Sequence, residues 1–204
     1  MSEIRYMMAT SAACASSYLD QALKHVGGLA DELIKSAGAL VARYGVISTG
    51  EQAGNIVLFQ GYEALSGIES AFDVYGKSSD YQAIMSSGKV KVALRNILKM
   101  EALQLQNPSA EVPAYGVLTR WGSADLMLDR MRDIVPLFEE NGAMIMRYST
   151  IMTGSDVGRR LLGVGYPSMD AIEKTYDALR SSKDYKAMVG DIELDWRNIV
   201  KFVG

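Results

Sequence analysis

The sequence predicts an α+β protein built from two βαββαβ units in tandem. The first observation is an internal repeat, because residues 38–81 align without a gap with residues 142–185, and 17 of the 44 aligned positions are identical. Such self-similarity is typical of a duplicated structural unit. The second observation is the order of strand-like and helix-like segments, which is the same on both sides of residues 101–112. The third is the length, because 204 residues suffice for two cores of about 100 residues each.

The first unit opens with a strand and a helix. Residues 4–10 are rich in bulky side chains, which favours a strand. From Ser16 to Gly38 apolar residues recur every three or four positions, as on one face of a helix, and Gly38 is typical of the residue that follows a helix end. Inside this helix Gly27 and Gly28 should each cost about 1 kcal/mol relative to alanine. They therefore predict a local bend or a close backbone approach at this point.

A hairpin follows this helix. Residues 40–48 are apolar on both alternating sets of positions, so both faces of this strand are expected to be covered. Arg43 is its one charged residue and shares a face with Ile47. A glycine-bounded turn at residues 49–54 leads into a strand at residues 55–62, which completes the hairpin.

A second helix and a fourth strand close the first unit. Residues 64–75 have apolar side chains at helical spacing, and residues 78–85 read as one capped helical turn. Residues 90–100 form the fourth predicted strand. The first unit therefore spans residues 1–100.

The second unit repeats this order after a polar linker. The linker covers residues 101–112, and the second unit spans residues 113–204. Its predicted strands are residues 115–121, 144–152, 160–166 and 192–202, and its predicted helices are residues 123–140 and 169–179.

Composition and charge narrow the function classes. The net charge is −3 and the sequence pI is about 5.3, whereas a nucleic-acid interface needs clustered basic residues, so no nucleic-acid partner is expected. Cys14 and His25 are the single cysteine and the single histidine, which excludes an intrachain disulfide and a two-histidine metal site. No apolar run approaches the roughly 20 residues of a membrane span, and the first residues lack a signal-peptide core. We expect a cytoplasmic protein with no membrane partner, no metal and no cofactor. The sequence leaves open whether two chains form a homodimer.

Three short motifs recur at the same places in both units. They are an Arg-Tyr pair in the second strand, a Gly-Tyr pair at the end of the third strand, and Ser-x-Asp-Tyr-x-Ala after the second helix. With the duplicated βαββαβ order, these motifs make the chain resemble the dimeric α/β-barrel superfamily of ferredoxin-like proteins, in a tandem single-chain form. A ferredoxin-like sheet carries its helices on one face and must bury the other face against a second layer. The resemblance therefore implies two ferredoxin-like repeats that close a barrel within one chain.

The superfamily includes antibiotic-biosynthesis-type monooxygenases that need no cofactor, haem-degrading enzymes, muconolactone-isomerase-like proteins, stress-responsive proteins and uncharacterised members. The resemblance implies a small-molecule ligand in a cavity between the sheet and the helices of each half. Haem-binding members use an axial histidine. His25 has no counterpart in the second half, so the resemblance does not extend to a repeated haem site.

Arg43 and Arg147 stand in strands that are otherwise largely apolar, and a buried guanidinium group needs a partner. Two interpretations are open. Each arginine pairs with a duplicated aspartate of its own unit, or both arginines anchor a carboxylate or an enolate. The aspartates concerned are Asp73, Asp80, Asp177 and Asp184.

The candidate catalytic residues are His25, a general base near neutral pH, together with Arg147 and Tyr148. Other duplicated or conspicuous side chains are candidates for lining a ligand cavity, and core packing is the alternative for each tyrosine, tryptophan and methionine among them. The ligand-binding candidates are Arg43, Tyr44, Tyr62, Trp121, Met131, Met146, Tyr166, Trp196 and Asn198.

These residues predict a protein that binds a small apolar or aromatic molecule, and three kinds of function fit. The first is a cofactor-free monooxygenase or isomerase, in which polar side chains stabilise an enolate-like charge. The second is a non-catalytic stress-response or ligand-sequestering module. The third is a structural barrel with no usable cavity. A filled core in which every arginine is paired would exclude the first two.

Overall fold

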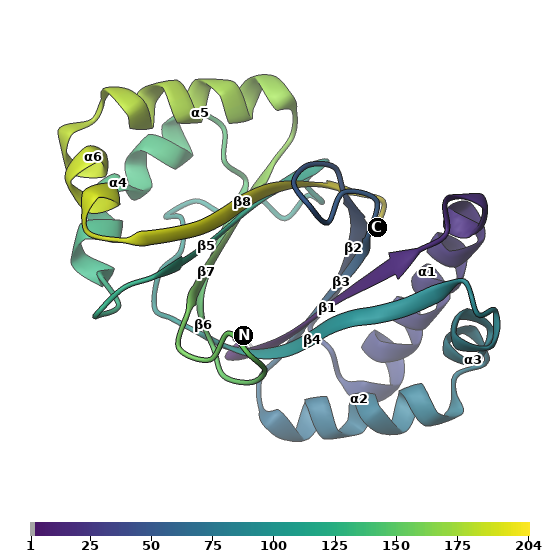
Figure 1. Ribbon diagram of the computed structural model, residues 1–204. Coiled ribbons are helices and arrows are strands. Elements are labelled where there is room, and N and C mark those ends of the chain that lie inside the picture. Colours follow the sequence, from purple (N-terminus) through teal and green to yellow (C-terminus); the bar gives the residue numbers. More distant parts are fainter. Residues whose placement is uncertain (1–2) are drawn as a thin grey trace.

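The computed structural model describes residues 3–204 and has the mixed α+β architecture that the sequence predicts (Figure 1). Eight antiparallel strands form a closed barrel in the order β1-β3-β2-β8-β5-β7-β6-β4. Helices α1 to α6 lie on the outside of this barrel. Among residues 3–204, no helix is both long and apolar enough to cross a membrane.

The same order of elements occurs twice along the chain. The first half contains β1 (Tyr6–Cys14), the short 3-10 helix η1 (Ser16–Tyr18), α1 (Leu19–Ala37), β2 (Val41–Ile47), β3 (Ile56–Tyr62), α2 (Leu65–Lys77), α3 (Ser79–Ser86) and β4 (Val90–Met100). The second half contains β5 (Tyr115–Gly122), α4 (Leu128–Glu140), β6 (Ile145–Ile151), β7 (Arg160–Tyr166), α5 (Met169–Ser181), α6 (Lys183–Gly190) and β8 (Glu193–Phe202).

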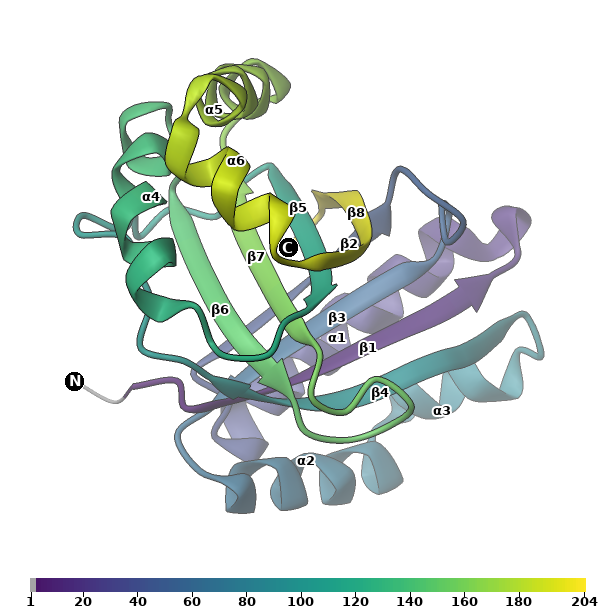
Figure 2. The same cartoon turned by 60° about the vertical axis from the view of Figure 1, so that its left-hand side comes forward.

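The barrel is closed by two seams between four-stranded segments. The first-half strands lie in the order β4-β1-β3-β2 and the second-half strands in the order β8-β5-β7-β6. At the seams β2 pairs with β8 and β4 pairs with β6. Closure leaves no strand edge unpaired. Figure 2 shows α1 to α3 on the first-half strands and α4 to α6 on the second-half strands.

The buried apolar residues form three clusters. One lies between the first-half strands and their helices and contains Met8 and Leu33. Its counterpart in the second half contains Met131 and Phe138. The third cluster combines residues of both halves in the barrel interior, namely Ile47, Val57, Leu118 and Val200.

Strand alternation decides which side chains of β2 face the interior. Tyr44 packs against the first helix-facing cluster, whereas Val41, Arg43 and Ile47 line the interior. The prediction that both faces of residues 40–48 are covered is therefore confirmed, because one face meets α1 and the other faces the barrel interior.

Gly27 and Gly28 allow a close approach to α1. A Cβ atom at Gly27 would lie 2.6 Å from the Tyr44 hydroxyl oxygen, and one at Gly28 would clash with the Asp80 carboxylate. The helix is continuous from Leu19 to Ala37, and the glycine pair lies where two side chains of other elements approach it closely.

The helix predicted at residues 123–140 begins only at Leu128. The Asp125 carboxylate accepts a hydrogen bond from the Met127 backbone N–H at 2.8 Å, and Met127 has a φ of 50°. This local turn chemistry competes with helix formation, so the segment before Leu128 is not helical.

The capped helical turn predicted at residues 78–85 is present, and an equivalent segment follows the second helix of the other half. The two segments form the eight-residue helices α3 and α6. Ser78 and Ser182 cap them by accepting hydrogen bonds from the backbone N–H groups of Tyr81 and Tyr185. The first strand extends beyond its predicted end at residue 10, because residues 11–14 pair with β4.

Each β-hairpin loop is attached to the last strand of the other half. In the amide orientation that satisfies both partners, Asn198 donates to the Thr49 carbonyl oxygen at 3.1 Å, and Asn96 donates to the Thr153 carbonyl oxygen at 3.0 Å. Both threonine hydroxyls accept a backbone hydrogen bond from the same strands. Asn198 thus lies at a contact between the two halves.

Candidate functional site

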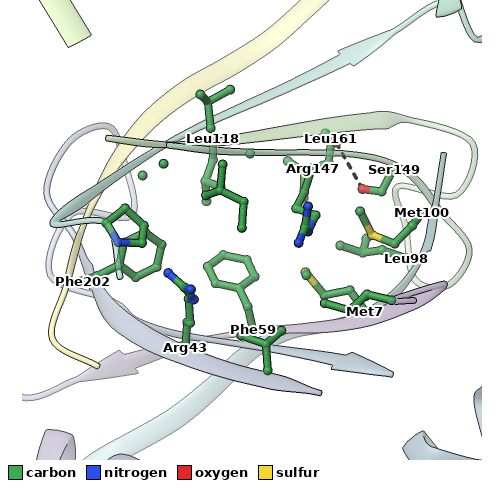
Figure 3. A pocket seen from close by; sticks show the side chains of 18 of the residues that line it. Met7, Arg43, Phe59, Leu98, Met100, Leu118, Arg147, Ser149, Leu161 and Phe202 are labelled. Carbon is green, nitrogen blue, oxygen red and sulfur yellow. Dashed lines mark hydrogen bonds between the residues drawn. The ribbon is translucent and has the colours of Figure 1, made fainter. Parts of the chain in front are cut away.

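The barrel encloses a cavity of about 310 Å³ between its two four-stranded segments (Figure 3). This volume lies at the small end of the ~300–1,000 Å³ found for ligand pockets. The walls come from both halves of the chain and are mainly aliphatic and aromatic, as is usual for such pockets. They include Met7, Phe59, Leu98, Leu118, Leu161 and Phe202.

Two arginines project into this cavity from opposite walls (Figure 3). Arg43 lies on β2, and Arg147 holds the equivalent position of β6. Across the hairpins Arg43 is paired with Phe59, whereas Arg147 is paired with Gly163. The two backbone positions are therefore equivalent, but one arginine has a phenylalanine on the neighbouring strand and the other has a glycine.

Neither arginine has a carboxylate partner within residues 3–204, and no acidic side chain lines the cavity. Arg43 Nη1 is buried and makes no hydrogen bond, while Arg147 Nη1 donates to the Met146 carbonyl oxygen at 3.1 Å. Burial lowers the pKa of both guanidinium groups, and the charge of Arg43 lowers the pKa of Arg147 further. Because a buried unpaired cation is unfavourable, the cavity is electrostatically complementary to an anion.

The aspartate partners considered for these arginines lie elsewhere. Asp80 contacts His25 Nδ1 at 2.8 Å, and Asp177 pairs with Arg180 at 3.6 Å. The other two aspartates are exposed on the outer helices. The reason is geometric, because strand alternation turns both arginines into the barrel while all four aspartates belong to helices outside it.

The cavity continues into a broader depression of about 790 Å³ at the surface. Ile4, Leu40, Met100 and Arg147 line both spaces. Arg147 therefore borders both spaces, whereas Arg43 borders the cavity alone. Two carboxylates, those of Glu3 and Glu101, line the depression but not the cavity.

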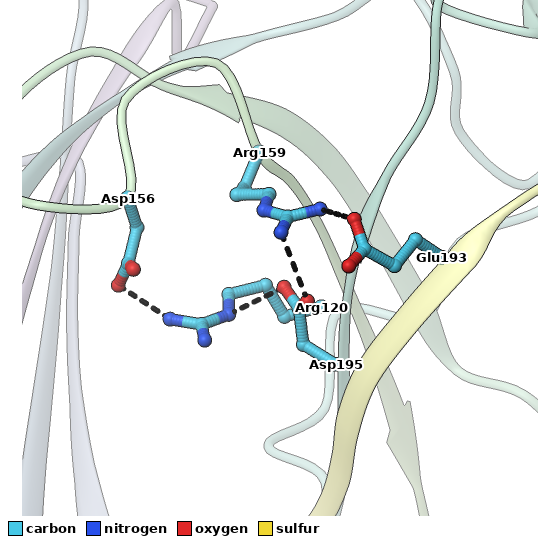
Figure 4. Close-up of polar contacts among 5 residues, drawn as sticks. All are labelled: Arg120, Asp156, Arg159, Glu193 and Asp195. Atoms are coloured by element: carbon cyan, nitrogen blue, oxygen red, sulfur yellow. Dashed lines mark hydrogen bonds and ion pairs between the residues drawn. The ribbon is translucent and has the colours of Figure 1, made fainter.

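The other end of the barrel interior holds an arginine that is paired (Figure 4). Arg120 Nε donates to Asp195 at 2.9 Å, its Nη1 bonds to Asp156, and its guanidinium group lies 5.2 Å from the ring centre of Trp196. Arg159 extends the network with a contact to Asp195 at 3.5 Å. Only about 60 Å³ remains open here, so this end is closed by an ion-pair network.

The cavity predicted between the sheet and the helices of each half was placed wrongly. The spaces there measure about 50 Å³ in the first half and about 20 Å³ in the second. Large side chains such as Tyr62, Met131 and Tyr166 fill these layers. This location was implied by the resemblance to the superfamily, and apolar or methionine-rich segments do not by themselves distinguish a filled core from a cavity wall.

The residues present do not fit a haem group. The haem-binding members of the superfamily use an axial histidine, but Nδ1 of His25 is hydrogen-bonded to Asp80 in the helix layer. The space between that layer and the sheet is far smaller than a haem. In the described part of the chain, no three His, Cys, Asp or Glu side chains gather as a metal site would require.

The predicted site residues are distributed over several parts of the molecule. Arg43 and Arg147 come together at the barrel cavity, Trp196 lies at the closed end, Asn198 lies at a seam, and His25 lies in the outer helix layer. The remaining candidates belong to the two helix-facing clusters, and they are Tyr44, Tyr62, Trp121, Met131, Met146, Tyr148 and Tyr166.

The cavity residues that sequence reasoning missed are apolar or lack a side chain. Phe59 and Gly163 are the clearest cases, because they flank the two arginines from the neighbouring strands. The internal repeat aligns these two positions, so the change from phenylalanine to glycine is visible in the sequence. From the sequence alone this change could not be linked to a cavity. The structure makes that link, because both positions face the interior of the barrel.

Comparison with protein families gives a match over most of the chain. The family described as "Domain of unknown function (DUF6854)" matches residues 4–100 and residues 113–202. No curated protein matches the sequence.

Several solved structures share the fold. A candidate monooxygenase from Fusobacterium nucleatum subsp. nucleatum has a TM-score of 0.69 at 10% identity, with 100% of this chain and 94% of that chain covered. A candidate monooxygenase from Lactobacillus acidophilus has a TM-score of 0.61 at 12% identity, with 98% and 94% covered. A variant of the chlorite dismutase from Candidatus Nitrospira defluvii has a TM-score of 0.64 at 8% identity, with 100% and 93% covered.

At these identities the likeness concerns the fold alone, and it places the chain among proteins with the dimeric α/β-barrel, ferredoxin-like architecture. The family match is of a different kind, because it rests on the sequence and covers both halves of the chain. The chain belongs to the DUF6854 family of domains of unknown function.

Proposed function

We propose that this protein binds a small, largely apolar molecule inside the barrel. The observation that carries the proposal is the cavity of about 310 Å³, which has mainly apolar walls and adjoins a second space beside Arg147. Pockets of this kind, apolar with a few polar groups that converge on the ligand, are the usual form of a small-molecule site. Because the walls come from both halves, the site belongs to the whole chain.

The proposal includes the organisation of the chain. We infer that residues 1–100 and residues 113–204 are two copies of one ferredoxin-like unit and that residues 101–112 join them. The repeated order of elements and the two ranges of the family match support this division. The linker region would then have a second role, because Ser109 and Ala110 form part of the cavity wall.

The test is native mass spectrometry of the protein purified from its host, with a visible absorption spectrum alongside. We expect the wild-type protein to retain a small molecule and the Gly163→Leu variant to lose it. A leucine side chain at this position would occupy the space beside Arg147, and its Cβ atom would lie at an ordinary distance of 3.4 Å from Leu118. Gly163→Ala is the matched control, since one methyl group leaves most of the cavity open.

Two results would contradict the proposal. In the first, the wild-type protein and Gly163→Leu retain the same molecule, which would place the ligand outside the barrel. In the second, the wild-type protein retains nothing and binds neither added octanoate nor added 1-octanol in calorimetric titrations.

A catalytic role is the second candidate function, and the two unpaired guanidinium groups are the observation that favours it. Fixed cationic donors in a dry site stabilise an enolate, as a cofactor-free monooxygenase or an isomerase would require. A sequestering module would use the same cavity without turnover. If the retained molecule is unchanged in mass and structure after incubation with the wild-type protein in air, the sequestering role is favoured. A conversion that disappears in Arg147→Met favours the enzyme.

A further inference from the structure

We propose that Arg43 and Arg147 form a two-arginine clamp for a carboxylate, so that the ligand of the barrel is an apolar carboxylic acid bound in its ionised form. This inference deepens the proposed binding function and rests on it. It adds the chemical class of the ligand and the orientation in which it is held.

The first support is that Arg43 and Arg147 differ in their hydrogen-bond partners from Arg95 and Arg197, a second pair of arginines at equivalent positions of the two halves. Arg95 and Arg197 each hydrogen-bond to a threonine and to a tyrosine hydroxyl, and each stacks on a tyrosine ring at 4.5 Å. The protein therefore supplies these cations with partners on the helix side of the strands. Arg43 and Arg147 have no such combination of threonine, tyrosine hydroxyl and tyrosine ring among the described residues. Arg43 Nη1 is buried and makes no hydrogen bond.

The second support is the geometry of the two guanidinium groups. They enter from opposite walls of one cavity (Figure 3), and the charge of Arg43 is close enough to lower the pKa of Arg147. Two like charges in one apolar space repel each other, and an anion between them removes both the repulsion and the missing hydrogen bonds. The planar fork of a guanidinium group matches the two oxygens of a carboxylate.

The surroundings favour a carboxylate over a larger anion such as a phosphate monoester. A phosphate group needs donors for three terminal oxygens, but the hydroxyl of Ser149, which lines the cavity, already donates to the Leu161 carbonyl oxygen at 3.1 Å. Apart from Ser109, the other side chains that line the cavity are apolar. Two arginines with two carboxylate oxygens between them leave no ligand oxygen without a donor.

The carbon body of the ligand has a defined place. Phe59 and Phe202 meet edge to face, with ring centres 6.5 Å apart, and form one apolar wall. Leu118 and Leu161 line the same cavity, and Gly163 leaves space beside Arg147. The carboxylate is therefore held between the arginines, while the apolar body extends along these side chains.

The first experiment compares acids with neutral alcohols of the same shape. The probes are octanoate with 1-octanol and 3-phenylpropionate with 3-phenyl-1-propanol, titrated calorimetrically into the full-length protein. We expect each acid to bind at least about 10-fold more tightly than its alcohol. Arg43→Met and Arg147→Met should each weaken acid binding by at least about 10-fold and leave alcohol binding within about twofold. Arg180→Met, on the exterior of α5, is the control that should change neither.

The second experiment needs no ligand. If the two arginines serve to bind an anion, replacing either by methionine removes a charge that has no partner in the ligand-free protein. The melting temperature of the ligand-free protein should then stay unchanged or rise. If they are structural instead, both variants should melt at lower temperature, as Arg120→Met is expected to do.

Each outcome has a distinct meaning. Equal binding of acids and alcohols that is lost in Gly163→Leu would leave the cavity proposal intact and overturn the clamp. Lower melting temperatures for both clamp variants, with acid binding unchanged, would overturn it as well. Failure of the wild-type protein to bind any of the four probes would remove the binding function and the clamp together.

Discussion

The half-buried arginines at the two ends of the barrel interior have opposite surroundings. At the closed end Arg120 meets Asp156 and Asp195 and lies over Trp196. At the open end neither Arg43 nor Arg147 forms an ion pair with a carboxylate of residues 3–204. A guanidinium group withdrawn from water is tolerated when it is paired, and it is unfavourable when it is not. The comparison indicates that the ion pairs at the closed end contribute to stability. At the open end the arginines lack such partners, as is expected of a site that binds an anion.

The alignment of the two halves shows which residues account for this difference between the two ends. Arg43 and Arg147 are equivalent, but Arg120 and Asp156 take the places that Ser11 and Gln52 hold in the first half. Ser11 and Gln52 form only a neutral hydrogen bond of 3.4 Å. The ion-pair network therefore belongs to one half alone, and the barrel has one plugged end.

Arg120→Met should have the largest effect on the free energy of unfolding. The variant leaves Asp156 without its cation, and we expect a loss of about 2–3 kcal/mol. Urea unfolding of Arg120→Met and of Arg43→Met, side by side, measures the contrast between the two ends. An equal loss in both variants would mean that the two ends do not differ in the way described.

Phe59→Leu tests the apolar wall beside Arg43. Phe59 is in edge contact with Phe202, and a smaller side chain leaves part of that contact unfilled, so we expect a loss of about 1–2 kcal/mol. Gly163→Leu changes the equivalent position of the other half in the opposite sense and should not destabilise the protein. Thermal unfolding of the two variants shows whether the cavity beside Arg147 can accommodate a leucine side chain. A large loss for Gly163→Leu would indicate that the space is filled in solution.

Ser149→Asp should make the open end resemble the closed one. Ser149 lines the cavity two residues after Arg147 on the same face of β6, so an aspartate there supplies an internal partner. We expect a gain of about 1 kcal/mol in the free energy of unfolding and a loss of octanoate binding by at least about 10-fold. Ser149→Asn is the neutral control for shape. Unchanged octanoate binding in Ser149→Asp would argue that the arginines do not hold the acid.

Glu193→Gln should have the smallest effect, and the effect should depend on pH. The hydrogen bond from Arg159 and its charge hold the pKa of Glu193 below its ordinary value. Because the pKa is depressed in the folded protein, the contribution to stability is present above the unfolded value of about 4.3 and is lost as the pH falls through the folded value. Melting curves between about pH 3 and pH 7 should show the wild-type protein above Glu193→Gln at neutral pH, with the difference closing in acid. A constant difference across this range would contradict the assignment.

The local structure could be read from the sequence in large part. The predicted strands at residues 90–100 and 160–166 have the observed bounds, and both predicted hairpins pair as expected. These features depend on short-range periodicity and on glycine-bounded turns, which one stretch of chain contains by itself. The late start of α4 was missed because the Asp125 side chain competes locally with the helix.

The candidate site was only partly predictable. Arg43 and Arg147 stood out as charges in largely apolar strands, and the structure brings them to one cavity. The tyrosines and methionines drew attention for the same apolar context but lie in the helix-facing layers. Periodicity tells two faces of a strand apart but does not say which face meets a helix and which meets a cavity.

The sequence by itself determined the repeated order of elements, the lack of a second histidine or cysteine, and the placement of one arginine at the same point of each half. Only the tertiary structure decided that the two arginines face each other across one interior, that no aspartate reaches them, and that the opposite end is closed by Arg120. The physical reason is that strand alternation is a property of neighbouring residues, whereas closure of the barrel pairs strands from distant parts of the chain. Whether a buried charge has a partner depends on that closure.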